Sequence, residues 1–304
     1  MKASRLFSAC LLLFSVCRSY ATIIVVIYTP DGYWIGADSV RTIGDNRTQT
    51  VCKVHLTKFG WLLKSGNTVG TRTDGTLYST DKEVEDLLST TTLATEFKER
   101  LRLVFKRDIE AEMVYVLNDP TVTIDNLEST PFQIPLQDEF VAELSRSIVL
   151  LPSNPADGSG ELLQVEPMGQ PVSRNWLGQV QYKYWAPSVS GWHPIQDLRP
   201  IVNTPNGIIT FPPSVHMFGH PVQYDRPDDW VLLHPQEALT EILKKAHDQD
   251  PKGVGPPYTI VHVRKSKTQE TGYEFVAKAP CPSWNEGISS EVGPMEFWKN
   301  PISQ

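Results

Sequence analysis

The stretch TIIVVIYTPDGYWIGADS, residues 22–39, is the part of this 304-residue chain that decides its fold. Residues 23–27 form an uninterrupted β-branched run, which is typical of a strand covered on both faces. Residues 29–32, Thr-Pro-Asp-Gly, have the composition of a tight turn. Residues 33–37 then predict a second strand, which Asp38 closes. The chain after residue 21 is therefore expected to begin with two strands joined by a turn.

A secretion signal is predicted directly before this stretch, over residues 1–21. It has a basic start (Lys2 and Arg5), an apolar segment over residues 6–16 and a small-x-small cleavage site, Ser-Tyr-Ala, at its end. The apolar segment is shorter than the roughly 20 residues that span a bilayer; a retained signal anchor is the alternative. Cleavage there would make Thr22 the first residue of a secreted or periplasmic protein.

An amino-terminal threonine carries a nucleophile and a base on one residue. Its hydroxyl can attack a carbonyl carbon, and its freed α-amine can take the hydroxyl proton. The unperturbed pKa of an α-amine, about 7.7–8.0, lies near the working pH that favours general-base catalysis. Thr22 is therefore the candidate nucleophile.

Composition excludes several function classes. The chain has a net charge of −7. The charged residues within positions 1–21 are all basic, so their removal would make the chain more acidic. Nucleic acid and anionic lipid are therefore unfavourable partners. No membrane span is expected after the signal. His216 and His220 are four residues apart but lie in a strand-like context, so no metal site is predicted. The motifs of serine hydrolases, nucleotide enzymes and Cys-x-x-Cys proteins are absent, and no cofactor is expected.

One domain is expected over residues 22–278, followed by an extended tail over 279–304. Hydrophobic periodicity and turn signals predict further strands over 51–57, 61–64, 146–151, 161–166, 215–218, 258–264 and 273–276, and helices over 81–88, 95–116 and 235–248. Residues 167–214 are rich in proline and tryptophan with little periodicity, and are predicted to form an ordered but irregular insertion that carries short strands.

Residues 22–39 resemble the start of a mature proteasome β subunit and, more broadly, the secreted N-terminal-nucleophile hydrolases. In that family a Thr opens the chain, Ala-Asp-Ser ends the second strand and a Lys opens the third. Asp38 stands at the family's spacing from Thr22, and Lys53 falls one residue short of it. The sequence Ser-Gly-Asn at residues 65–67 matches the turn after the fourth strand. The resemblance implies an α+β fold, a four-layer αββα sandwich, and a threonine peptidase acting on peptides or small amides.

The chemistry of these positions can be stated from their residue types. A lysine at position 53 near Thr22 would lower the pKa of the threonine hydroxyl and amine, and Asp38 would supply its counter-charge. A backbone N–H near Gly66 or Asn67 could stabilise the oxyanion. We expect Thr22, Asp38 and Lys53 to meet at one edge of a sheet.

The resemblance weakens toward the C-terminus. Where the family has an orienting Asp and two Ser residues, this chain offers Asp250 (one residue out of place), Val254 and His220. A catalytically silent secreted binding domain on the same fold therefore stays open, as does a homo-oligomer. Cys52 and Cys281 could form a disulfide or remain two separate thiols.

Overall fold

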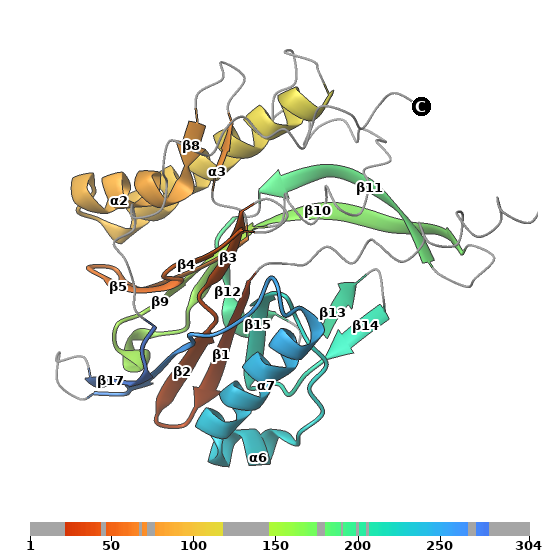
Figure 1. Ribbon diagram of the computed structural model, residues 1–304. Helices are drawn as coiled ribbons and strands as arrows, with labels where there is room; N and C mark the ends of the chain where they lie inside the picture. The colour runs from red at the N-terminus through yellow and green to blue at the C-terminus, as the bar shows by residue number, and fades with distance from the viewer. Residues whose placement is uncertain are drawn as a thin grey trace, which may run out of the picture.

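The computed structural model describes residues 22–43, 47–66, 69–71, 77–117, 146–174, 180–189, 191–198, 201–204, 207–266 and 272–279. Within these residues two antiparallel sheets dominate, with helices beside them (Figure 1). Three further two-stranded hairpins, β3–β4, β7–β8 and β13–β14, stand outside the two sheets. Their strands are Val40–Ile43, Arg47–Thr50, Val69–Thr71, Leu77–Ser79, Ile201–Thr204 and Gly207–Thr210.

The first sheet contains both strands of the opening stretch. Its strands follow the order β15-β1-β2-β16-β17 and are Val215–Gly219, Ile23–Thr29, Gly32–Ala37, Thr259–Arg264 and Gly272–Ala277. The predicted turn joins β1 to β2, with Thr29 paired to Gly32 and Ile24 paired to Ala37. The antiparallel register brings the start of β1, the end of β2 and the end of β15 to the same edge.

The second sheet follows the order β11-β10-β9-β6-β5. Its strands are Val180–Val189, Glu161–Arg174, Arg146–Leu151, Gly60–Gly66 and Val54–Thr57, and the short β12, His193–Pro194, pairs with β10. Two 3₁₀ turns, Pro155–Asp157 and Ile195–Asp197, lie in its connections.

Side chains of β1 alternate between two hydrophobic clusters, which explains its continuous β-branched run. Ile24 and Val26 pack against Trp61 and Leu63 of the second sheet. Ile23, Val25 and Ile27 pack on the other face against residues of α7, Pro235–Gln249. Each such fully buried side chain stabilises the fold by roughly 1.5–3 kcal/mol.

Four helices accompany the sheets in the described part of the chain. They are α2 (Thr80–Thr90), α3 (Ala94–Leu117), α6 (Asp228–Leu233) and α7. Helix α7 begins at Pro235, a residue favoured in the first helical turn, and it contacts β1 and β2. The apolar stripe predicted for α3 is buried at Phe97, Leu101, Phe105 and Ile109. No described helix is both long enough and apolar enough to cross a membrane.

Two fold predictions are wrong. The described chain is mostly two antiparallel sheets with few helices, a sheet-rich fold rather than a four-layer αββα sandwich; the helical layers had been inferred from the resemblance. The segment 167–214 is also more regular than the predicted insertion with short strands, since its first part pairs as the long hairpin β10–β11. Its prolines are tolerated because Pro167 and Pro171 adjoin register shifts, and Pro187 lies in β11 at the end of the strand order.

Candidate active site around Thr22

Thr22 directly precedes β1 and is 5 % exposed. Its carbonyl oxygen accepts a hydrogen bond of 2.7 Å from the backbone N–H of His220. Gly219 before that histidine has φ +87°, and a Cβ atom there would lie 2.2 Å from the Thr22 carbonyl oxygen. Only glycine permits this close approach without strain, so the end of β15 holds Thr22 in place.

Asp38 and Lys53 form a buried ion pair beside the start of β1. The Lys53 ammonium lies 2.8 and 2.9 Å from the two carboxylate oxygens of Asp38 and donates to the Val40 carbonyl at 2.6 Å. Asp38 is 0 % and Lys53 5 % exposed. The carboxylate also accepts the backbone N–H groups of Ile23 at 2.9 Å and Val40 at 3.0 Å. The pair is therefore linked to the peptide bond between Thr22 and Ile23.

Burial and hydrogen bonding act on Asp38 in opposite directions. Burial raises the pKa of the Asp38 carboxyl, whereas the Lys53 ammonium and the N–H groups of Ile23 and Val40 lower that pKa. The charged carboxylate is thus supported by its partners and not by solvent. Removal of Lys53 would leave a buried carboxylate without its cation.

The expectation that these residues meet at one edge of a single sheet is wrong. Thr22 and Asp38 belong to the first sheet, but Lys53 directly precedes β5 of the second. The backbone of Lys53 is fixed there, since its carbonyl accepts the N–H of Lys64 at 3.1 Å. The ion pair therefore joins the two sheets.

The end of β6 also reaches Thr22. Ser65 is buried, and its hydroxyl oxygen would lie 2.9 Å from a Cβ atom on Gly219, next to the Thr22 carbonyl. Gly66 follows with φ +92° and is exposed, while Asn67 lies outside the described residues. The Ser65–Gly219 contact was not expected from the sequence; the glycine before His220 was its one local signal.

His220, whose backbone N–H donates to the Thr22 carbonyl, is influenced by the charge of Asp250. Asp250 follows α7, is 8 % exposed and accepts the Gly253 N–H at 2.9 Å. Burial lowers the pKa of the His220 imidazole, and Asp250, the Gln249 side chain and Asp38 raise it. Asp250 and Asp38 therefore both act electrostatically on the imidazole.

Val254, which stands where the resemblance expected a serine, is fully buried in the apolar cluster around α7. It brings no hydroxyl to the neighbourhood of Thr22.

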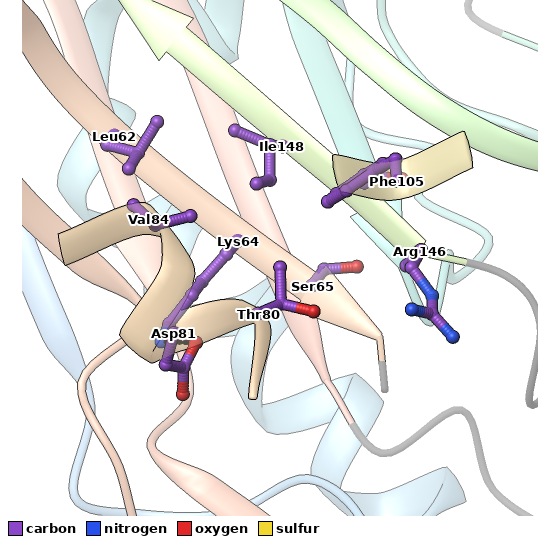
Figure 2. Close-up of a pocket in the computed structure, with 10 residues that line it drawn as sticks. Leu62, Lys64, Ser65, Thr80, Asp81, Val84, Phe105, Arg146 and Ile148 are labelled. Atoms are coloured by element: carbon purple, nitrogen blue, oxygen red, sulfur yellow. Dashed lines mark hydrogen bonds and ion pairs between the residues drawn. The ribbon is translucent and has the colours of Figure 1, made fainter. Parts of the chain in front are cut away.

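A small pocket lies on the helix side of the second sheet (Figure 2). Lys64 of β6 points into it and forms a buried ion pair with Asp81 in the first turn of α2. Thr80, Phe105 and Arg146 line it as well. Because Lys64 and Leu63 alternate along β6, the pocket lies on the opposite face from the apolar contact between the sheets.

Cys52, next to Lys53, is disulfide-bonded. Cys281, its partner in the sequence-based hypothesis, lies outside the described residues. Among the described residues no group of three or more His, Cys, Asp or Glu side chains could hold a metal ion.

No family model and no curated protein matches this chain. It is similar to solved structures of Anbu proteins. The Gly-1 mutant of Anbu from Hyphomicrobium sp. strain MC1 has a TM-score of 0.41 and 11 % identity over 86 % of this chain and 90 % of that chain. Anbu (ancestral beta-subunit) from Yersinia bercovieri has a TM-score of 0.37 and 12 % identity over 79 % and 80 %. The helical assembly of the Anbu complex from Pseudomonas aeruginosa has a TM-score of 0.40 and 13 % identity over 84 % and 87 %.

These neighbours correct the family suggested by residues 22–39. They are Anbu proteins, proteasome-like but distinct from the secreted N-terminal-nucleophile hydrolases that the sequence suggested. The low identities and TM-scores carry no argument about activity.

Proposed function

We propose that the chain is an amide-bond hydrolase that uses Thr22 as its amino-terminal nucleophile. The observation that carries the proposal is the buried Lys53–Asp38 ion pair, whose carboxylate accepts the N–H of Ile23 directly after the threonine. A buried ion pair is costly to assemble. Because Asp38 accepts the N–H of the first peptide bond after Thr22, the ion pair is positioned to act on that threonine.

The proposed reaction begins with cleavage after Ala21, which frees the α-amine of Thr22. The Thr22 hydroxyl oxygen bonds to the substrate carbonyl carbon while its proton passes to the α-amine. The Lys53 ammonium makes the hydroxyl easier to deprotonate, and Asp38 holds that ammonium in place. A backbone N–H at Gly66 receives the oxyanion. The C–N bond then breaks, the α-ammonium protonates the leaving amine, and water releases the acyl group.

The substrate in this proposal is a peptide or a small acyl amide. The first test needs no substrate: N-terminal sequencing and intact mass of exported protein should give a chain that begins at Thr22. Ala21→Arg removes the small residue required at the cleavage site and should leave the chain uncut. A terminus several residues from Thr22 would remove the base and end the proposal.

The second test is covalent labelling by a peptidyl epoxyketone, which reacts with a hydroxyl and an amine on the same residue. The processed chain should gain the mass of one probe, whereas Thr22→Ala should gain none. Equal labelling of Thr22→Ala would assign the reaction to another residue.

A catalytically silent binding domain is the second candidate, and Val254, which is buried where the resemblance expected an orienting serine, favours it. Under this reading the processed chain remains unlabelled by the epoxyketone although it is folded and begins at Thr22.

Export and homo-oligomerisation complete the proposal. Cell fractionation should place the processed chain outside the cytoplasm, and light scattering should give the mass of at least two chains.

A further inference from the structure

His220 is fixed directly against the proposed nucleophile. It follows the last residue of β15, and its backbone N–H donates to the Thr22 carbonyl at 2.7 Å. The preceding Gly219 packs so closely on the same carbonyl that no side chain fits between them. The imidazole therefore extends from a backbone whose position is set by Thr22 itself.

Asp250 is a buried carboxylate to which the proposed reaction gives no role. One carboxylate oxygen accepts the Gly253 N–H at 2.9 Å, and the other is buried and accepts no hydrogen bond from the described residues. The residue lies at the C-terminus of α7, where the helix dipole disfavours a negative charge. A carboxylate more than nine-tenths buried at such a position needs compensation by a donor or a cation. His220, on which it acts electrostatically, can supply that compensation.

We propose that His220 relays the proton at the Thr22 site, oriented and stabilised by Asp250. The inference rests on the proposed function and adds one step to it. When the Thr22 α-amine has taken the hydroxyl proton, one ammonium N–H bond breaks and an N–H bond forms on the imidazole. The α-amine is neutral again, and the charge of Asp250 stabilises the imidazolium that results. The proton later returns through the amine to the leaving group.

The charges around the ring suit this role. Burial lowers the pKa of His220 below its ordinary value, so the ring is neutral near pH 7 and can accept a proton. Asp250 directly follows α7 in sequence and Asp38 directly follows β2. Both carboxylates raise the pKa of His220 and favour the protonated ring once it forms. The cation paired with Asp38 is Lys53.

The test measures the rate of epoxyketone adduct formation on the processed chain by intact mass, from pH 5.5 to 8.5. Closure of the adduct requires the α-amine to lose the proton that it took from the hydroxyl, so the rate reports the relay. His220→Gln should lower the rate about 100-fold, the lower end of general acid–base contributions. His216→Gln is the matched control: His216 is a buried histidine within β15 that packs edge-on against Tyr28, away from Thr22.

Asp250→Asn tests the relay without removing the ring. Loss of the Asp250 charge should lower the pKa of His220, so the fall in rate at acid pH should move to lower pH, and the plateau rate should also fall. A purely structural role would change the plateau and leave the acid limb in place. Circular dichroism checks that each variant is folded.

The outcomes separate the two proposals. No adduct on the folded, processed wild-type chain would end the proposed function itself. Wild-type labelling with an unchanged rate in His220→Gln, or an unmoved acid limb in Asp250→Asn, would overturn the relay and leave Thr22 as nucleophile.

Discussion

Two buried Lys–Asp ion pairs arise from the same hairpin and face different parts of the molecule. Lys53 directly precedes β5 and Lys64 lies on β6, with their backbones joined by the hydrogen bond from the Lys64 N–H to the Lys53 carbonyl. Lys53 reaches Asp38 of the first sheet, whereas Lys64 reaches Asp81 of α2 on the opposite side. Both pairs are nearly inaccessible to solvent, so burial alone does not distinguish them.

What differs is the group that each carboxylate holds besides its lysine. Asp81 lies in the first turn of α2, where the helix dipole favours an anion, so that pair has a structural explanation. Asp38 instead accepts the N–H of Ile23, next to Thr22. A buried ion pair is therefore weak evidence for catalysis, and its connection to the proposed nucleophile is the informative observation.

The largest expected effect comes from replacing the two lysines in turn. Lys53→Met should slow epoxyketone labelling of the processed chain about 10²–10³-fold, the range observed when an electrostatic contribution is removed from a reaction site. Lys64→Met, the matched change on the neighbouring strand, should label within about threefold of wild type, because Lys64 lies on the far face of the sheet.

Both variants should be compared under conditions where circular dichroism shows a folded chain. Equal loss of labelling in both would mean that any buried pair in this hairpin affects Thr22 through folding alone, and the comparison would fail.

The second prediction concerns stability of the Lys64–Asp81 pair. Lys64→Met or Asp81→Leu alone should lower the free energy of unfolding by about 3–5 kcal/mol, since each removes the opposite charge that faces the remaining buried charge in the ion pair. The double variant Lys64→Met/Asp81→Leu should recover most of that loss because neither charge of the pair stays buried. Urea unfolding measures all three; a double variant as unstable as the sum of the singles would contradict this account.

Much of the first sheet could be predicted from local sequence. Residues 23–27 specify a strand buried on both faces, and the Pro-Asp-Gly turn fixes its pairing with β2. Helix α7 was predictable from Pro235 and the apolar spacing after it. The resemblance of residues 22–39 also selected Asp38 and Lys53, whose roles at Thr22 are still predictions.

What could not be predicted depends on contacts between distant residues. Local patterns do not show that Lys53 belongs to another sheet than Thr22, or that Gly219 touches the Thr22 carbonyl. The prolines of residues 167–187 indicated irregular chain because their place at register shifts is a property of the pairing. The prediction of a secreted N-terminal-nucleophile hydrolase was wrong because a resemblance over one short motif was extended to the whole chain.

The third prediction concerns how Asp108, a buried carboxyl on α3, makes the free energy of unfolding depend on pH. Burial, then repulsion by Glu83, raises the pKa of Asp108 on α3 to about 7, against the opposing effect of Arg146 and Arg107. Between pH 4 and 7 the folded state then holds a proton that the unfolded state releases. The free energy of unfolding therefore falls as pH rises through this window, by roughly 3–4 kcal/mol.

Asp108→Asn should abolish that slope and be more stable than wild type at pH 8. Urea unfolding at pH 5 and pH 8 measures the difference. Asp157→Asn, at an exposed carboxyl, should keep the wild-type slope; an unchanged slope in Asp108→Asn would place the titration elsewhere.

The smallest expected effect separates backbone strain from contact with Thr22. Gly219 and Gly158 both have positive φ, +87° and +136°, so alanine is strained at either position by about 1–3 kcal/mol. A Cβ atom at 158 meets nothing within 4 Å, whereas one at 219 would lie 2.2 Å from the Thr22 carbonyl oxygen. Both variants should therefore lose stability in urea, Gly219→Ala more than Gly158→Ala, and only Gly219→Ala should also lose epoxyketone labelling, because its Cβ atom must displace Thr22. Equal labelling in the two would mean that the reaction tolerates movement of the nucleophile, which the fixed geometry of the Lys53–Asp38 pair argues against.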